Sequence, residues 1–337
     1  MVRKAFRAAL VVAIVGTGIF AAWLSREINR RPDGPPRKFI FEIERGKGVR
    51  WIARLLKQRQ VLTREWPFLV EYRLFVSPKG LRAGEYELSL PVGVKDVLHD
   101  LLEGKVFLHP LTIPEGLTAR EIARLVPSLG FGREQEFLDA FEDPGEVRSL
   151  DPKARTCEGY LFPETYHFPK GTPARQITKA MLTEFESVFQ DAWRRRGREI
   201  GLSLRETVIL ASLIEKETSL PEERKLVSTV FHNRLRMGMK LDCDPTIIYA
   251  LKQKNDYEGR LLRKDLTLDS PYNTYLYGGL PPGPICNPGK ISLEAALYPA
   301  ETNNLYFVSR NDGSHVFSKT FAEHQANVRK YQKHNKK

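Results

Sequence analysis

The feature that most constrains this chain is a run of 17 residues without any charge, from Ala8 to Leu24. At about 1.5 Å of rise per residue, a helix of that length is at the lower limit for crossing the hydrocarbon core of a bilayer. Basic residues flank the run on both sides, and Trp23 stands where a membrane–water interface would hold an indole ring. We therefore predict a retained transmembrane anchor within residues 1–30.

Two other interpretations compete with an anchor. A cleaved signal peptide has a similar apolar core, but no clear A-x-A cleavage site precedes the polar stretch that follows. A buried core helix is the second alternative. The basic residues are nearly balanced across the run, so the positive-inside rule favours a cytoplasmic N-terminus only weakly. With that orientation, the rest of the chain lies outside the cytoplasm.

Composition limits what the remainder of the chain can be. Its 53 Lys and Arg exceed its 41 Asp and Glu by 12, which favours an anionic partner such as nucleic acid, acidic lipid or a cell-wall polymer. Apolar residues make up 42%, which excludes a wholly disordered chain. The three cysteines, Cys157, Cys243 and Cys286, show no C-x-x-C spacing, so neither a disulfide scaffold nor a thiolate zinc cluster is expected.

A strand–turn–helix pattern occurs twice after a stiff, proline-rich linker at residues 31–37. Ile43-Glu-Arg-Gly46 opens the first copy and Ile113-Pro-Glu-Gly116 opens the second, and each leads into a periodic helix. Between them, alternating residues 86–90 predict a strand, and an apolar stripe over 94–102 predicts a helix that ends near Gly104. Units of this kind are typical of α+β modules. Two explanations of the repeat stay open: the two copies serve packing alone, or they form a groove for a ligand.

Longer helices are predicted from about residue 150. Periodic apolar residues over 177–193 predict a helix that ends before Gly197, and a helix apolar on all sides, hence buried, follows the capping box of Ser203 and Glu206. Further helices are predicted from Pro221 to Gly238 and from Asp244. Residues 272–289 predict an irregular loop, and residues 305–317 a β-hairpin around Asn311-Asp-Gly313. The predicted fold class is α+β, with a mainly helical C-terminal domain that ends in this hairpin.

The strongest chemical signal is Glu215-Lys-Glu217 at the end of the buried helix. An apolar setting, a neighbouring carboxylate and the negative end of the helix dipole all favour a protonated carboxyl there. Such a group can donate a proton at neutral pH, as cleavage of a glycosidic bond requires. Two positions along a helix correspond to about 200°, so the two carboxylates face different sides. Glu215 lies beside the small Ala211 and Ser212, which leave room for a ligand, whereas Glu217 is expected to be the structural partner of an arginine.

Other constellations carry less weight. The chain has no H-E-x-x-H, G-x-S-x-G or P-loop motif. His232, His315 and His324 are scattered and are expected to make hydrogen bonds in the core rather than to bind metal, so no metal or cofactor is predicted. The loop after Tyr272 combines aromatic, amide and rigid backbone groups, a combination that suits sugar rings. Its candidate groove residues are Asn273, Tyr275, Gly279, Leu280 and Pro281.

Six ordered motifs together resemble the endolytic murein transglycosylase family, also called YceG-like. They are residues 158–166 (EGYLFPETY), 211–217 (ASLIEKE), 230–235 (VFHNRL), 241–249 (LDCDPTIIY), the loop of 272–283 and the closing hairpin with Glu323-His324. The resemblance implies a LysM-like module at 38–110, a catalytic domain at 111–330 and a basic tail at 331–337. It also implies that the catalytic glutamate lies within 211–217, which we assign to Glu215 with Glu217 as the alternative.

The implied activity is a non-hydrolytic cut within nascent peptidoglycan. The bond broken joins N-acetylmuramic acid to N-acetylglucosamine through a β-1,4 linkage, and the product ends in 1,6-anhydromuramic acid. One carboxyl suffices for this, because the C6 hydroxyl of the same sugar replaces water. The resemblance further implies a single-pass protein of the inner membrane with its catalytic domain on the periplasmic side. Its partners would be peptidoglycan strands and penicillin-binding protein synthases.

Three rival functions stay open on the residues alone. A non-catalytic, membrane-anchored scaffold would grip peptidoglycan with the repeat module and use Glu215 structurally. A cytoplasmic nucleic-acid binder is disfavoured because the positive charges are spread along the chain rather than gathered into one element. An ordinary muramidase would need a second carboxylate to activate water, and no residue stands out for that role.

Overall fold

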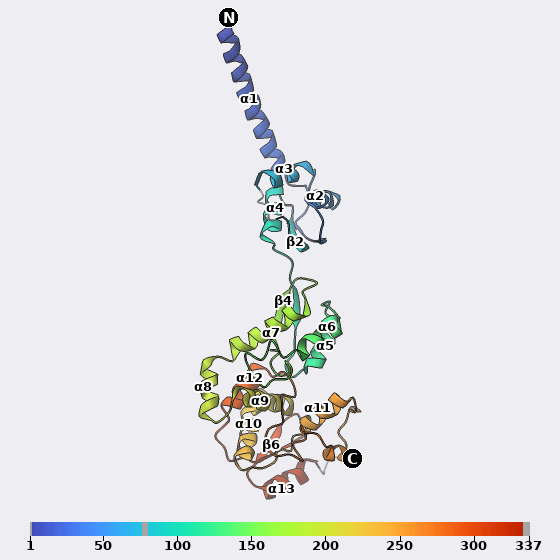
Figure 1. Cartoon of the computed structure of the whole chain (residues 1–337), viewed down its shortest axis with the longest axis vertical. Helices are drawn as coiled ribbons and strands as arrows, with labels where there is room; N and C mark the ends of the chain where they lie inside the picture. Colours follow the sequence, from blue (N-terminus) through green and yellow to red (C-terminus); the bar gives the residue numbers. More distant parts are fainter. Residues whose placement is uncertain (1, 76–79, 333–337) are drawn as a thin grey trace. The chain divides into compact units, whose positions relative to one another are not determined.

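The computed structural model describes residues 2–75 and 80–332, which divide into an N-terminal unit, residues 1–109, and a C-terminal unit, residues 110–337 (Figure 1). Each unit has its own apolar core. Of the basic tail predicted at 331–337, residues 333–337 lie outside the described part.

The N-terminal unit begins with the long helix α1 (Val2–Ile28). Within the described residues, one helix is long and apolar enough to cross a membrane, and it is this one, over Leu10–Ile28. From Leu10 onward its apolar side chains are exposed until the last turns, where Trp23 stacks on Trp66 with ring centroids 5.3 Å apart. Ile28 is buried in the core of the unit. The end of the apolar helix is therefore part of a folded core.

Two antiparallel strands and three further helices follow among the described residues of the N-terminal unit. Strand β1 (Arg37–Ile43) pairs with β2 (Gly84–Leu90) from Arg37 opposite Leu90 to Ile43 opposite Gly84. Helices α2 (Val49–Gln58) and α3 (Trp66–Phe75) lie between them in sequence, and α4 (Val94–Glu103) follows. The predicted strand at 86–90 and the helix ending at Gly104 are confirmed, since Gly104 adopts the left-handed cap conformation. Helix α3 was not predicted from the sequence.

The second copy of the repeat opens the C-terminal unit. Strand β3 (His109–Thr112) forms a two-stranded sheet with β4 (Thr165–Phe168), and helices α5 (Ala119–Ser128) and α6 (Glu134–Glu142) lie between them in sequence. The predicted strand, glycine turn and helix are present in both copies, with Gly46 and Gly116 at positive φ. Helix α5 begins with a capping box formed by Thr118 and Glu121.

The helix predicted over 177–193 is wrong in its extent, because the chain forms two helices there. Helix α7 (Ala174–Val188) stops where Phe189 leaves helical geometry, and α8 (Asp191–Glu199) starts after Gln190. The ring of Phe189 packs against Phe185 at 5.7 Å and against Trp193 at 5.7 Å, so the apolar contacts continue across the break. Gly197 lies within α8 and not at its end. Glycine is favoured at this position because a side chain there would come within 2.9 Å of the Leu202 carbonyl oxygen.

Helix α9 (Leu204–Glu217) lies in the middle of the C-terminal unit, in contact with α8, α10, α11 and α12 (Figure 1). Every residue from Thr207 to Ile214 is buried, as the apolar run predicts. The capping box at its start is confirmed, with the Ser203 backbone N–H donating to Glu206 at 2.8 Å. Helices α10 (Pro221–Arg236) and α11 (Asp244–Lys254) match their predicted starts, and a 3-10 turn (Arg263–Thr267) follows.

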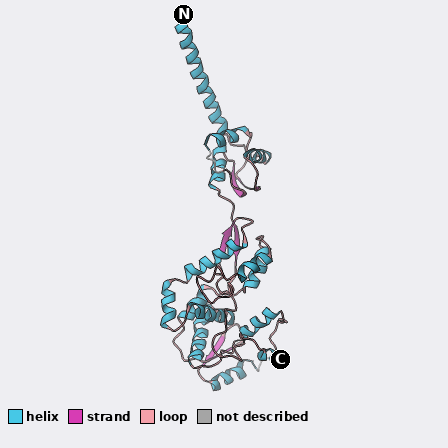
Figure 2. Cartoon of the chain, viewed as in Figure 1, coloured by secondary structure: helices cyan, strands magenta, loops and turns pink. Residues whose placement is uncertain are grey.

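Irregular backbone joins the last elements (Figure 2). No helix or strand occurs between residues 268 and 289, all of them described, as predicted for this loop. Helix α12 (Lys290–Leu297) then leads to the hairpin of β5 (Tyr306–Ser309) and β6 (His315–Ser318), followed by α13 (Phe321–Gln332). Asn311 and Gly313 both have positive φ, which explains the Asn-Asp-Gly turn.

Candidate active site

Glu215 lies in the last turn of α9 and forms a buried ion pair with Arg224 of α10. Arg224 Nη2 donates to Glu215 Oε1 at 2.9 Å, and the two side chains are 7% and 5% exposed. The short turn between the helices makes this contact, because Thr218 ends α9 in extended geometry and Pro221 starts α10. Arg224 therefore returns within one helical turn to the end of α9.

Two loops far away in sequence complete the surroundings of Glu215. The backbone N–H of Gly289 donates to Glu215 Oε2 at 3.0 Å, and Gly116 lies against the Glu215 side chain. The second guanidinium nitrogen of Arg224 contacts Glu115 Oε2 at 3.4 Å, and that side chain is 44% exposed. The Glu115 carboxylate fills the space that a side chain at position 289 would need, so only glycine fits there in this arrangement.

Opposing effects determine the pKa of Glu215. Burial raises the pKa of the carboxyl and is the largest effect. Arg224 and the Gly289 N–H lower it, whereas the nearby Glu115 carboxylate raises it. The net direction is upward, as expected for a carboxyl at the end of an apolar helix. Glu215 can therefore hold a proton, and its ionised form meets two donors when the proton leaves.

Glu217 faces a different part of the unit, in agreement with the 200° separation. Its carboxyl is hydrogen-bonded to the Cys243 thiol and lies near Asp244, and burial raises its pKa to about 7. The ion pair with Arg224 belongs to Glu215, whereas Arg234 acts on Glu217 only through its charge and lowers its pKa, without an ion pair between them among the described residues. The turn after α9 brings Arg224 to the Glu215 face of the helix.

The space expected beside Ala211 and Ser212 is filled by the chain itself. Both residues are fully buried. The Ile285 N–H donates to Ser212 Oγ at 3.1 Å, and the Cys286 thiol lies 3.4 Å from the Ser212 carbonyl oxygen. The small residues of α9 therefore admit residues 284–289 rather than a ligand. This segment ends at Gly289, whose backbone N–H donates to the carboxylate of Glu215.

The predicted groove residues have mixed environments. Asn273 is buried, and its amide donates to the carbonyls of Leu266 and Leu268 within its own loop. The Tyr275 hydroxyl donates to Asp244 at 2.6 Å, which places it nearer the Glu217 side of α9 than the Glu215 side. Gly279 is exposed at positive φ, Leu280 is half-buried and Pro281 is buried. Their role in a groove stays a prediction.

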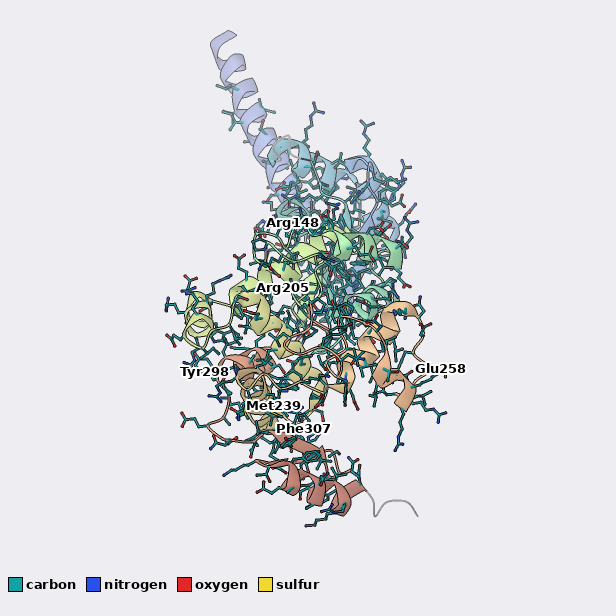
Figure 3. All side chains as sticks on the ribbon, turned by 60° about the horizontal axis from the view of Figure 1, so that its bottom comes forward. Arg148, Arg205, Met239, Glu258, Tyr298 and Phe307 are labelled. Atoms are coloured by element: carbon teal, nitrogen blue, oxygen red, sulfur yellow. The ribbon has the colours of Figure 1, made fainter. Side chains whose placement is uncertain are left out.

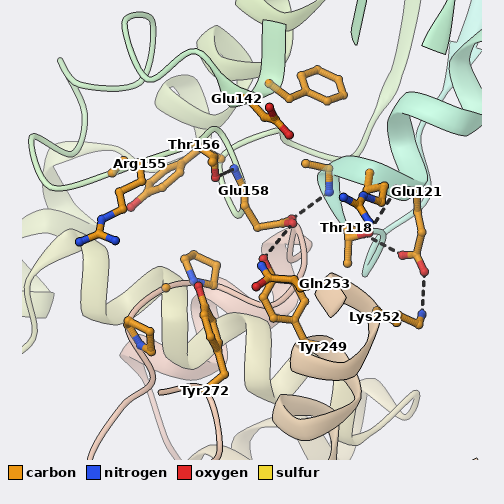
Figure 4. Close-up of a pocket in the computed structure, with 18 of the residues that line it drawn as sticks. Thr118, Glu121, Glu142, Arg155, Thr156, Glu158, Tyr249, Lys252, Gln253 and Tyr272 are labelled. Atoms are coloured by element: carbon orange, nitrogen blue, oxygen red, sulfur yellow. Dashed lines mark hydrogen bonds and ion pairs between the residues drawn. The ribbon is translucent and has the colours of Figure 1, made fainter. Parts of the chain in front are cut away.

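A cavity of about 1190 Å³ lies beside this site, and the sequence did not reveal it. Figure 4 shows Glu158 projecting into it, with Tyr249 and Tyr272 on one wall and Thr118 at the start of α5 on another. Glu158 Oε1 accepts from the Ala119 N–H and from the Asn287 amide, both at 3.0 Å. Burial raises the Glu158 pKa to about 8. Glu158 belongs to one of the six motifs, and no other feature of the sequence indicated that this residue would line a cavity.

Asn287 joins the cavity to the surroundings of Glu215. Its side-chain oxygen accepts from the backbone N–H groups of Gly159 and Leu161, and its amide also donates to Leu117. The backbone carbonyl of Asn287 accepts a hydrogen bond from the Gly116 N–H at 2.9 Å. The two loops that border Glu215, residues 113–118 and 284–289, are thereby hydrogen-bonded to each other.

Of the three histidines considered above, two have hydrogen-bond partners, whereas His324 Nδ1 is buried without one in the part of the chain that the structure describes. His232 contacts the Ala296 carbonyl oxygen at 2.8 Å, and His315 contacts Glu223 at 2.7 Å, which confirms hydrogen-bonding roles for both. All three cysteines are buried and unpaired, and burial raises the Cys157 pKa to about 12. Among the described residues, no group of three or more His, Cys, Asp or Glu is arranged to hold a metal ion.

The comparisons with known proteins agree on one family. The model of the YceG-like family matches residues 41–330. An endolytic murein transglycosylase of Bacillus subtilis is 33% identical over 307 residues, which cover 86% of this chain and 84% of that protein. One from Streptococcus pneumoniae D39 is 30% identical over 88% of this chain and 59% of its own length. A crystal structure of a YceG-like protein from Listeria monocytogenes matches with a TM-score of 0.58 and 34% identity, covering 86% of this chain and 98% of that one.

Proposed function

The chain belongs to the YceG-like family, and on this premise we propose that it is an endolytic murein transglycosylase with Glu215 as its acid–base group. The substrate is a nascent glycan strand, cut between N-acetylmuramic acid and N-acetylglucosamine without water. The observation that carries the role of Glu215 is its environment: a buried carboxyl with a raised pKa, held by one arginine and one backbone N–H.

The chemistry needs one carboxyl that acts twice. The protonated Glu215 donates to the glycosidic oxygen, the C1–O bond breaks, and the N-acetylglucosamine side leaves with a new hydroxyl. The ionised Glu215 then accepts the proton of the C6 hydroxyl on the muramyl sugar, whose oxygen bonds to C1 and closes the anhydro ring. Arg224 and the Gly289 N–H stabilise the carboxylate between the two transfers, because both donors already point at its oxygens.

Ring closure depends on positioning, since an intramolecular hydroxyl replaces water at a high effective concentration. We assign the wall that orients the sugar to the loop of residues 272–284, with Tyr275, Gly279, Leu280 and Pro281 as its candidates. Asn273 supports this wall indirectly, because its buried amide donates to the carbonyls of Leu266 and Leu268 and so holds the loop against the segment that precedes it.

We assign α1 to a retained, single-pass anchor in the inner membrane, with both folded units on the periplasmic side. The burial of Ile28 and the stacking of Trp23 on Trp66 support retention, because cleavage after the apolar run would remove part of a folded core. Burial of all three cysteines fits an oxidising compartment, since no thiol is accessible for pairing.

We assign the rest of the N-terminal unit, residues 38–110, to a LysM-like module and residues 111–330 to the catalytic domain. The order β1–α2–α3–β2, with its two strands antiparallel, supports the first assignment. A module that binds glycan next to the membrane would bring the enzyme to newly made strands. Peptidoglycan synthases are the partners we expect there.

Assays of Glu215→Gln and Glu217→Gln on purified sacculi test the proposal. Mass spectrometry of the released glycan should find 1,6-anhydromuramyl ends with the unmodified protein, and at least about a hundredfold fewer with Glu215→Gln. Glu217→Gln should retain most of the activity, because its carboxyl faces Cys243. Full activity of Glu215→Gln would refute the assignment. Absence of anhydro ends with the unmodified protein would favour the non-catalytic scaffold.

A further inference from the structure

The cavity beside Glu158 has no part in the mechanism above, although it lies close to Glu215. Gly116 contacts the Glu215 side chain, and Thr118 and Ala119 of the same loop line the cavity. Three residues span at most about 11 Å of chain, so the cavity begins within about two sugar residues of the reacting carboxyl. Pro284, in the second loop that borders Glu215, lines the cavity as well.

The charge of the cavity is positive once its ion pairs are accounted for. Three of its basic residues are neutralised: Lys252 by Glu121, Arg205 by Asp151 and Arg124 by Glu134. Three others remain, which are Arg120, Lys153 and Arg155. In the part of the chain that the structure describes, no ion pair is formed by Lys153 or Arg155, and Arg120 binds the amide oxygen of Asn255. Figure 4 shows Arg155 and Lys252 on opposite sides of the cavity.

Two carboxyls that line the cavity lie outside these pairs, and they do not cancel this charge. Glu158 has a pKa of about 8, so it is mostly protonated at neutral pH. Glu142 is the second carboxyl. Three cations that form no ion pair among the described residues therefore oppose one carboxylate of the lining, and Glu206, which does not line the cavity, acts on Lys153 from a longer distance. Phe141, Tyr249, Tyr272 and Pro284 form an apolar and aromatic part of the remaining wall, beside polar residues that include Thr156 and Gln253.

This lining does not suit the sugar rings of a peptide-bearing strand alone, because N-acetylglucosamine is uncharged and the lactyl carboxyl of the muramyl ring is taken up in the amide bond to the peptide. We propose that the cavity binds the carboxylate-bearing peptide carried by the muramyl sugar that Glu215 cleaves, an inference that rests on the proposed function. In peptidoglycan this peptide is attached at O3 of the same ring whose C1–O bond breaks, so it must lie within one sugar of Glu215. The free cations bind its carboxylates, and the aromatic wall packs on its short side chains. The chain therefore distinguishes peptide-substituted strands from bare glycan.

The test compares two substrates of equal length: glycan strands that retain their peptides, and the same strands after an amidase has removed them. The amidase leaves one lactyl carboxylate on each muramyl ring, whereas the peptide carries its carboxylates farther from the ring, so the comparison tests recognition of the peptide and not of charge alone. For the unmodified protein, kcat/KM for anhydro-end formation should be about tenfold higher on the peptide-bearing strands, which corresponds to about 1.4 kcal/mol. The double substitution Lys153→Gln with Arg155→Gln should lower this ratio to about one. Both side chains are exposed, so the fold should not change.

The matched control is Arg195→Gln with Arg198→Gln, two exposed arginines of α8 that do not line the cavity. It should keep the tenfold ratio. Equal kcat/KM of the unmodified protein on both substrates, or an unchanged ratio in the Lys153 and Arg155 variant, would overturn the inference and leave the proposed function intact. Absence of anhydro ends from either substrate would instead refute the proposed function.

A binding measurement separates a peptide site from a general anion site. Titration of the full chain carrying Glu215→Gln with the free stem peptide should show saturable binding that weakens with added salt. Inorganic phosphate at the same ionic strength should not displace the peptide. Displacement by phosphate at equal concentration would overturn the assignment to a peptide.

Discussion

Arg224 donates to Glu215 across 2.9 Å in a contact where both side chains are more than nine-tenths buried. An arginine that close favours the ionised carboxylate, whereas burial favours the protonated acid, and burial has the larger effect. Burial thus favours the protonated acid, and the arginine stabilises the anion that remains once the proton is given away. For a single group that donates and then accepts a proton, both properties are needed.

Removing the arginine should raise the pKa of Glu215. Since Glu215 must be protonated to act as the acid, the rate falls as pH rises through this pKa, and Arg224→Gln should move the alkaline limb of the kcat/KM profile to higher pH. The maximal rate should fall as well, because the carboxylate loses its donor. The exposed Arg198→Gln serves as a control and should leave the limb in place. An unmoved or lowered limb in Arg224→Gln would argue against Glu215 as the acid.

Glu115→Gln should have the opposite effect. The Glu115 carboxylate raises the pKa of Glu215, so neutralising it should lower that pKa and move the alkaline limb to lower pH. At neutral pH the rate should drop by less than about tenfold, because Glu115 is 44% exposed and water screens its charge. The same pH–rate series measures this shift. A shift in the same direction as that of Arg224→Gln would contradict the electrostatic account.

Glu158 should make the protein less stable as pH rises. The folded protein holds a proton on Glu158 up to a pKa of about 8, whereas the unfolded chain loses it near 4.5. Between these values the unfolded state binds fewer protons, so the free energy of unfolding falls with pH by about 1.4 kcal/mol per unit from this group. Glu158→Gln mimics the protonated form and should remove that fall.

Thermal unfolding of Glu158→Gln and the unmodified protein at pH 5 and pH 8 checks this. The gain in Tm from the substitution should be clearly larger at pH 8. Glu164→Gln, at an exposed position in the same motif, supplies the control and should show no such difference between the two pH values. An equal effect of Glu158→Gln at both pH values would mean that Glu158 is ionised in the folded protein.

Ile28→Ala should destabilise the N-terminal unit by about 2 to 5 kcal/mol, because it leaves a cavity in a packed core. Ile14→Ala, on the exposed part of α1, should have no comparable effect. Hydrogen exchange of β1 and β2 in the full chain, reconstituted in a bilayer, measures the difference. Equal exchange in both variants would show that α1 ends outside the core, and the argument for a retained helix would lose its support.

The positive charge of this protein gives little information about its partner by itself. Side chains with nitrogen ends project on every side of the view in Figure 3, and Arg205, labelled there, is neutralised by the buried Asp151. When the basic residues that form ion pairs are left out of the count, Lys153 and Arg155 are among the cations of the cavity that have no counter-ion within the described part of the chain. A count of charges therefore says less than knowing which of them lack a counter-ion.

Local patterns predicted most of the helices and strands. The capping box at Ser203, the glycine at position 104 and the Asn311 turn are read from a few neighbouring residues, and the structure confirms each of them. The break at Phe189 was missed because the apolar period continues through it. Periodicity records which side chains are buried, and two helices that share a core can continue one period.

The sequence alone determined that a long apolar helix precedes two folded units, that α9 is buried, and that Glu215 and Glu217 face different sides of it. These follow from the order and spacing of residues along one segment. Only the tertiary structure decided which carboxylate receives Arg224, that residues 284–289 fill the space over Ser212, and that Glu158 opens into a cavity. Those contacts join residues up to 129 positions apart, as between Glu158 and Asn287, and no local pattern encodes such distant pairings.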